Sequence, residues 1–172
     1  MFLFSFIANI ESAFKKPGEN LRIYRKYLEK IGVQKVPTIF WIGPWSEVYN
    51  FGKIKIGRNF AIGAKSSIIN WGKISIGNNF LGSNNIFMNS GDHRLSDLRP
   101  EKKQIVIGDN VFVGTNVVIV GNTKIGNNSV VGAGSVVRGT FPSNSLILGN
   151  PAKKVKTIDR KKYEIWKWHK NV

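Results

Sequence analysis

The sequence predicts a mainly-β protein whose short strands wind into a parallel β-helix, and two periodicities lead to this prediction. The pattern Ile-Gly-x-Asn occurs four times, at 56–59, 76–79, 107–110 and 125–128. Aliphatic residues also recur at every sixth position in two stretches. The first stretch contains Ile56, Ile62, Ile68 and Ile74, and the second contains Ile107, Val113, Ile119, Ile125, Val131 and Val137. Self-similarity at a fixed short period is typical of solenoids.

A period of six requires the chain to return to the same inward orientation after each flat segment and corner. It differs from the 3.6-residue period of a helix and from the alternation of a simple strand. The interval from Ile107 to Ile125 is three sixes, so three segments make one triangular coil. A β-sandwich would instead place its strands roughly 8–12 residues apart. Gly follows the key aliphatic residue at seven positions and Asn occupies many corners, where we expect left-handed backbone conformations. The seven glycines are at 57, 63, 77, 108, 114, 126 and 132.

The composition indicates a single soluble domain with appendages. The chain has 172 residues, 42% of them hydrophobic and 21% charged. No apolar run approaches the roughly 18 residues of a membrane span, so a cytoplasmic location is expected. The absence of Cys excludes disulfides, thiolate metal sites and a cysteine nucleophile. The net charge of +16 suggests an anionic partner such as nucleic acid, anionic lipid or a phosphorylated ligand, or else a merely solvated surface.

The β-helix is expected to span residues 51–152, between two helical ends. Residues 1–50 are predicted to form an N-terminal helical capping region. Its apolar segment, residues 1–16, is expected to pack on the solenoid end or on a neighbouring subunit, with contact to a membrane surface as the alternative. Residues 153–172 are predicted to form a basic helical tail.

An excursion is predicted near residues 87–103. The interval from Ile76 to Ile107 is longer than one coil by thirteen positions, whereas the interval from Ile56 to Ile76 is longer by only two. The inserted segment is densely polar and lies between two apolar repeat blocks. Long loops on a rigid scaffold are favoured places for binding and catalysis.

His93 in this excursion is the predicted catalytic base. It is one of two histidines, the other being His169 in the tail. Asp92 is adjacent and assigned to the same catalytic group, and Asn89 and Asp97 are further polar partners that could fix the imidazole tautomer. Asn89 is also predicted to bind substrate. An acceptor hydroxyl is a poor nucleophile at neutral pH and needs such a base.

These features resemble the hexapeptide-repeat acyltransferases, whose coils wind left-handed. In that family the catalytic His lies shortly before a block that here reads Ile107-Gly-Asp-Asn-Val-Phe-Val-Gly114, and the β-helix ends in a segment like Gly149-Asn-Pro-Ala-Lys153. The resemblance implies acetyl-CoA as co-substrate, with no metal. It places Thr115 and Ala133 on the pantetheine arm and Lys153 and Lys156 on the nucleotide phosphates. Many relatives have Thr-Lys where this chain has Arg138-Gly139, so the positive charge is kept but shifted by one position. Arg138 is therefore also assigned to the coenzyme.

The resemblance is nearest to O-acetyltransferases of surface-polysaccharide assembly, so the expected acceptor is a sugar hydroxyl and the expected assembly a homotrimer. An amino sugar or antibiotic acceptor, giving N-acetylation, is the alternative. A γ-class carbonic anhydrase needs three His ligands and fails because the chain has two. A regular scaffold or ice-binding solenoid would not need the excursion. A basic nucleic-acid-binding solenoid is the remaining rival and predicts salt-sensitive binding.

Overall fold

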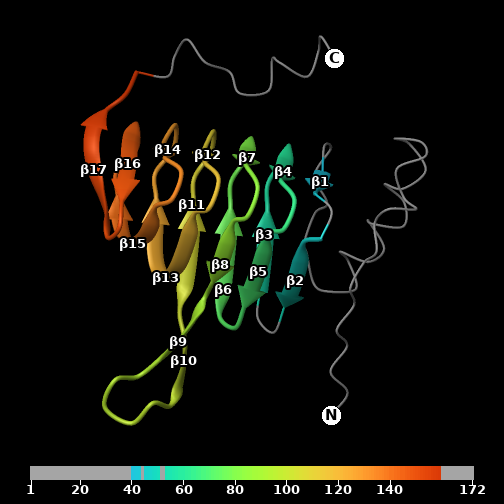
Figure 1. Cartoon of the computed structure of the whole chain (residues 1–172), viewed down its shortest axis with the longest axis vertical. Coiled ribbons are helices and arrows are strands. Elements are labelled where there is room, and N and C mark those ends of the chain that lie inside the picture. Colours follow the sequence, from blue (N-terminus) through green and yellow to red (C-terminus); the bar gives the residue numbers. More distant parts are fainter. Residues whose placement is uncertain (1–39, 44, 51–52, 160–172) are drawn as a thin grey trace, which may run out of the picture.

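The chain winds as a parallel solenoid of short strands with three faces (Figure 1). The computed structural model describes residues 40–43, 45–50 and 53–159. The strands before the excursion are β1 (Phe40–Ile42), β2 (Glu47–Asn50), β3 (Lys53–Ile56), β4 (Phe60–Ile62), β5 (Ser67–Asn70), β6 (Lys73–Ile76), β7 (Phe80–Gly82) and β8 (Phe87–Asn89). They are followed by β9 (Gly91–His93), β10 (Pro100–Lys102), β11 (Gln104–Ile107), β12 (Phe112–Val113), β13 (Val118–Ile125), β14 (Val130–Val131), β15 (Val136–Phe141), β16 (Ser145–Gly149) and β17 (Ala152–Thr157).

Each face is a ladder of equivalent strands from successive coils. The first face has the order β1-β4-β7-β12-β14-β16 and is closed by antiparallel β17. The second face contains β2, β5, β8 and the first half of β13, and the third contains β3, β6, β11 and the second half of β13. Strands β13 and β15 therefore bend across the corner between the second and third faces. These ladders confirm the predicted fold class, a mainly-β parallel β-helix built from hexapeptide repeats.

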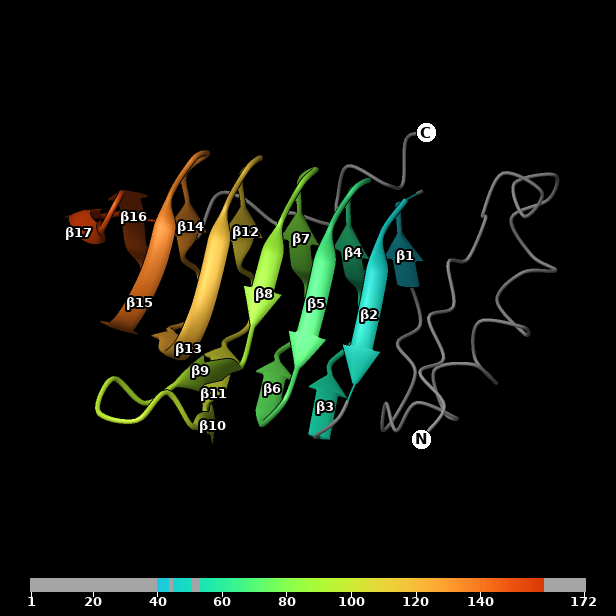
Figure 2. The same ribbon diagram turned by 60° about the horizontal axis from the view of Figure 1, so that its bottom comes forward.

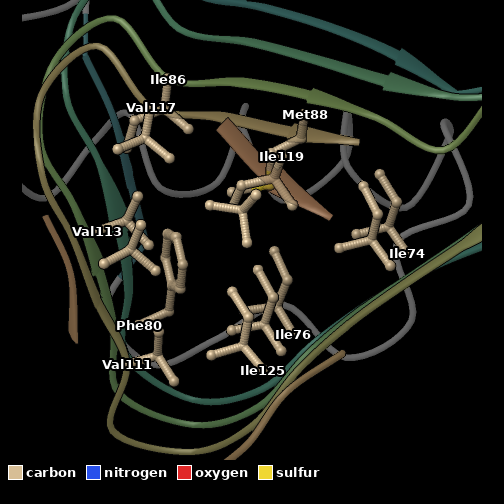
Figure 3. Close-up of a cluster of buried hydrophobic side chains, with 14 of the residues drawn as sticks. Ile74, Ile76, Phe80, Ile86, Met88, Val111, Val113, Val117, Ile119 and Ile125 are labelled. Carbon is tan, nitrogen blue, oxygen red and sulfur yellow. The ribbon is translucent and has the colours of Figure 1, made fainter. Parts of the chain in front are cut away.

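The core is a continuous stack of aliphatic and aromatic side chains inside the coils (Figure 3). All of the residues on which the period of six was based are buried. Phe60 and Phe80 occupy equivalent places in successive coils and stack with their ring centroids 5.2 Å apart. The periodicity therefore identified the inward-facing positions, because only those positions exclude water in every coil.

One corner, which we call the asparagine corner, joins the third face to the first. Its left-handed position is held by Asn59, Asn79, Asn110 and Asn128, with φ between 56° and 58°. Their side-chain amides form a ladder between coils, in which each Nδ2 donates to the next Oδ1 at 2.7, 2.7 and 3.0 Å. Asn tolerates this conformation better than other side chains. The expectation that Asn serves the corners is confirmed.

The repeat glycines serve a different purpose from the predicted one. None of the seven has a positive φ. A Cβ on Gly108 would lie 2.2 Å from Oδ1 of Asn127 in the next coil, and one on Gly77 would lie 2.4 Å from Oδ1 of Asp109. The expected left-handed role was therefore wrong for these residues, because what they provide is space for the neighbouring coil.

The coils change length at the corner between the second and third faces, which we call the hairpin corner. In each coil the chain enters this corner at one of a set of aligned residues and leaves it at one of another set. The pairs of entry and exit residues are Ile68 and Ile74, Met88 and Ile105, Ile119 and Thr123, and Val137 and Gly139. The step from Met88 to Ile105 is by far the longest, and the step from Val137 to Gly139 is the shortest. The excursion thus lies at this corner and accounts for the whole of the extra length that the repeat spacing predicted.

The ends of the solenoid differ from the predicted boundaries. Strands β1 and β2 lie within residues 1–50, so the β-helix begins before residue 51. Residues 153–157 belong to β17 and are not helical, because they pair with β16 through the turn at Gly149. The helical predictions for 1–39 and 160–172 lie outside the described residues. Within the described part of the chain, no helix has the length and apolarity to cross a membrane.

Substitution of Asn110 separates the two contributions of the asparagine corner. Asn110→Gly retains the left-handed φ but removes two amide hydrogen bonds, and we expect a loss of about 1–2 kcal/mol in unfolding free energy. Asn110→Ala loses the same bonds and adds a left-handed penalty of about 1–2 kcal/mol. Urea unfolding of both variants measures the difference. Equal stability of the two variants would show that backbone conformation is not the constraint at this corner.

Candidate active site

The predicted excursion is a β-hairpin that leaves the solenoid at the hairpin corner (Figure 2). Strands β9 and β10 pair antiparallel, with His93 opposite Pro100, Asp92 opposite Glu101 and Gly91 opposite Lys102. Both views place the connecting loop, residues 94–99, toward the C-terminal coils. The excursion therefore has its own backbone pairing, which limits the positions that His93 can adopt.

A buried hydroxyl anchors both ends of the hairpin to the solenoid. Ser90 is fully buried and its Oγ donates to Oδ1 of Asn70 at 2.7 Å. The same Oγ accepts from the N–H of Gly72 at 3.1 Å, and the Ser90 carbonyl accepts from the N–H of Lys103 at 2.8 Å. Buried polar groups require such partners, so this network fixes where the chain departs and returns.

The hairpin tip is organised around Asp97. Its Oδ1 accepts from Nε of Arg94 at 2.8 Å and from the N–H of Arg99 at 3.2 Å, while its Oδ2 lies 3.5 Å from Nε of Arg99. Asp97 was one of the predicted partners for the His93 tautomer. The structure instead places its carboxylate between the two arginines of the tip.

Asp92 is held from two sides and orients the backbone of His93. Its Oδ1 accepts from the N–H of His93 at 2.8 Å, and its Oδ2 accepts from Nη2 of Arg138 at 2.9 Å. The hydrogen bond from His93 is the main cause that lowers the pKa of Asp92, and the positive charges of Arg138 and Lys103 lower it further against partial desolvation. The carboxylate is therefore kept charged and fastens β9 to β15.

The His93 side chain lies on the opposite face of the hairpin from the Asp92 side chain, because successive residues of a strand point to opposite faces. The imidazole is exposed, and no hydrogen bond from the described residues engages it. Asn89, the predicted substrate ligand, ends β8 and its Oδ1 accepts from the N–H of Gly91 at 2.8 Å. It thereby shapes the turn that leads into β9.

Trp71 was not among the site residues predicted from the sequence. This side chain is 46% exposed, and its Cδ1 would lie 2.7 Å from a Cβ on Gly91. The positions of Trp71 and Gly91 are separated by the same interval as Ile68 and Met88, which is the length of the coil that precedes the excursion. That spacing was the signal in the sequence that could have placed the indole beside the hairpin.

The residues assigned to the donor occupy other parts of the solenoid. Thr115 and Ala133 are exposed and stack at the corner between the first and second faces, where the N–H of Gly134 donates to the Thr115 carbonyl at 2.9 Å. The length of strand that separates Thr115 from the hairpin corner is about 16 Å at the usual rise. Lys153 and Lys156 are exposed on β17. Arg138 stands apart from them because it is paired with Asp92.

A family model matches one part of the solenoid, directly after the hairpin. The model described as bacterial transferase hexapeptide (six repeats) matches residues 104–139, which run from β11 into β15. This segment contains Thr115, Ala133 and Arg138, and ends at the bend of the hairpin corner. It confirms the predicted resemblance to the hexapeptide-repeat transferases. No curated protein matches the sequence.

Three solved structures that are similar to this chain are acetyltransferases. A galactoside acetyltransferase in complex with coenzyme A is 29% identical, with a TM-score of 0.73 over 86% of this chain and 76% of that one. A hexapeptide-repeat acetyltransferase from Vibrio cholerae O1 biovar eltor, complexed with acetyl-CoA, is 26% identical with a TM-score of 0.72 over 84% and 80%. A maltose O-acetyltransferase from Clostridium difficile 630 is 26% identical with a TM-score of 0.68 over 84% and 80%. The predicted enzyme class, an acyltransferase, is confirmed.

Titration of Asp92 tests the contact with Arg138. We expect Arg138→Gln to raise the pKa of Asp92 yet leave it below its usual value of 3.8, because the His93 N–H bond persists. A lowered native pKa stabilises the fold above the unfolded pKa, and this stabilisation is lost as pH falls through the native value. Arg138→Gln should therefore lose less unfolding free energy than the intact protein as the pH is lowered from about 4. Carboxyl NMR titration measures the shift, with Arg99→Gln at the tip as control. An unchanged Asp92 titration in Arg138→Gln would contradict the ion pair.

Proposed function

We propose that the protein transfers an acetyl group from acetyl-CoA to a hydroxyl group of a saccharide, with His93 as the general base. The observation that carries this proposal is the exposed imidazole on a hairpin anchored at both ends, beside a transferase hexapeptide segment. Two of the similar structures hold coenzyme A or acetyl-CoA, and two are named for galactoside or maltose acceptors.

The chemistry requires one proton acceptor and one oxyanion donor. His93 removes the proton of the acceptor hydroxyl as its oxygen attacks the thioester carbonyl. The tetrahedral intermediate collapses to the acetyl ester and the thiolate of coenzyme A, which takes the proton back from His93. A backbone N–H on a repeat corner is the simplest donor for the oxyanion. No covalent enzyme intermediate is needed.

Asp92 is a positioning residue in this proposal. Its carboxylate holds the backbone N–H of His93 and is itself held by Arg138, so it sets the location of the strand that carries the base. Because a base displaced by about 1 Å can cost a hundredfold in rate, this restraint bears directly on turnover. Arg138 supports the site through this contact, and its predicted contact with the coenzyme stays a prediction.

The donor is proposed to lie along the corner of Thr115 and Ala133. Thr115 and Ala133 are exposed at equivalent places in successive coils, which suits an extended pantetheine arm, and the exposed Lys153 and Lys156 suit its nucleotide phosphates. The thioester must cross the second face to reach His93 of the same chain. A homotrimer would bring the hairpin of one subunit to the donor groove of another, and the outward, half-buried Ile69, Phe87 and Val120 of this face suit such an interface.

We further infer a cytoplasmic protein, since acetyl-CoA is the proposed donor. Residues 1–16 are proposed to pack on the solenoid or on a neighbouring subunit, with membrane contact as the alternative. Thermal unfolding in the presence of vesicles containing anionic lipid distinguishes the two.

Replacing His93 tests the assignment of the base. We expect His93→Ala to lower acetyl transfer to saccharides by about 10²–10⁴-fold, whereas acetyl-CoA still raises the unfolding temperature of the variant because it binds the native state. Release of free coenzyme A measures transfer, and His169→Ala is the matched histidine control. Full activity of His93→Ala would disprove the base assignment, and the lack of any shift with acetyl-CoA would disprove the donor. Preferred transfer to amino sugars would replace O- by N-acetylation.

A further inference from the structure

We propose that the acceptor is an acidic saccharide, whose sugar ring stacks on Trp71 and whose carboxylate is bound by Lys102. This inference rests on the proposed function and names the acceptor class and two residues that select it. The site lies on the His93 face of the hairpin, at the point where the hairpin leaves the solenoid.

Trp71 presents an aromatic surface at this point. Its ring edge occupies the space beside Gly91, where any Cβ would lie 2.7 Å from Cδ1 and 3.1 Å from Cγ. The contact places the indole against the hairpin backbone while 46% of the residue stays exposed. A partly exposed, partly fixed indole offers a large apolar surface at little cost in side-chain entropy. This surface matches the C–H face of a pyranose.

The hairpin geometry places Trp71 and His93 on one face. Residues 91 and 93 are two apart in β9 and therefore point to the same side. Since Trp71 occupies the side on which Gly91 would carry its Cβ, a sugar stacked on the indole lies on the side of the imidazole. Gly91 and His93 are about 7 Å apart along the strand, roughly the length of one sugar residue.

Lys102 adds a cation to the same face. It stands directly opposite Gly91 in the hairpin register, and directly opposed residues share a face. Its side chain is exposed, and among the described residues no carboxylate pairs with it. The two acidic residues of β9 and β10, Asp92 and Glu101, face the other way and are paired with Arg138 and Lys103. The His93 face of the hairpin is therefore cationic.

The positive charge continues from this corner along the third face. Lys53 and Lys73 are exposed and directly paired, each as the first residue of its strand, β3 or β6. Like charges placed opposite one another destabilise a sheet. None of the ion pairs of the described chain compensates them. A chain of acidic sugars that continues beyond Trp71 would meet these two amines next.

Direct binding tests the inference without any need for turnover. The probes are a glucuronate-containing tetrasaccharide and its carboxyl-reduced counterpart, which differ only in charge. We expect calorimetric titration to give at least about tenfold tighter binding of the acidic probe. Trp71→Ala should weaken both probes by about tenfold, whereas Trp71→Phe retains most of the affinity because it keeps an aromatic face. Lys102→Ala should abolish the difference between the probes.

The controls separate this inference from the proposed function. Lys124→Ala removes an exposed lysine from the third face at a greater distance, and we expect it to bind both probes as the intact protein does. Acetyl-CoA should stabilise Trp71→Ala and Lys102→Ala as it does the intact protein. Equal binding of both probes, or no binding of either, overturns the acidic acceptor. Lost acetyl-CoA stabilisation in Lys102→Ala assigns this amine to the donor and overturns its role here.

Discussion

The close approach of successive coils is the constraint on which the rest of the structure depends. At the asparagine corner each coil must turn in a left-handed conformation and leave no space for a Cβ at the preceding glycine. The amide ladder from Asn59 to Asn128 then ties four coils together along the axis. A coil cannot shift at this corner without breaking bonds to its neighbours. The scaffold is consequently rigid where it carries no chemistry.

The hairpin corner is free of that constraint and varies in length from coil to coil. Apart from the excursion, its step shortens along the solenoid, from Ile68–Ile74 to Ile119–Thr123 and then to Val137–Gly139. The ladders of the other corners continue through these changes, so an insertion here does not disturb the core. The shortest step ends immediately after Arg138, and this is the coil that reaches back to hold Asp92. Variation at one corner thus supplies both the excursion and its restraint.

The sequence predicted the parts of the structure that repeat, and it predicted less of what depends on contacts between coils. Period-six aliphatic residues located the core and the excursion because burial acts on every coil alike. The repeat glycines were expected to adopt left-handed conformations, whereas they leave room for the next coil. A sequence does not reveal how near that coil lies. Trp71 was overlooked because its contact with Gly91 depends on the length of the coil that precedes the excursion, which differs from the 18-residue length of the later coil from Ile107 to Ile125. Residues 153–157 were expected to be helical because they carry no hexapeptide repeat, and their antiparallel pairing with β16 leaves no periodic signal in the sequence.

The two faces of the hairpin have different roles in the proposed site. On one face, Asp92 and Glu101 are neutralised by Arg138 and Lys103, so the acidic residues serve to fasten the hairpin. On the other, His93, Lys102 and Trp71 meet solvent with no acidic residue of β9 or β10 beside them. A carboxylate next to the imidazole would stabilise its protonated form but would also repel an anionic acceptor. Placing Asp92 behind the strand lets it position the base through the backbone while the front stays cationic. In this arrangement no carboxylate of β9 or β10 contacts the His93 imidazole. The site is therefore suited to an acceptor that carries a negative charge.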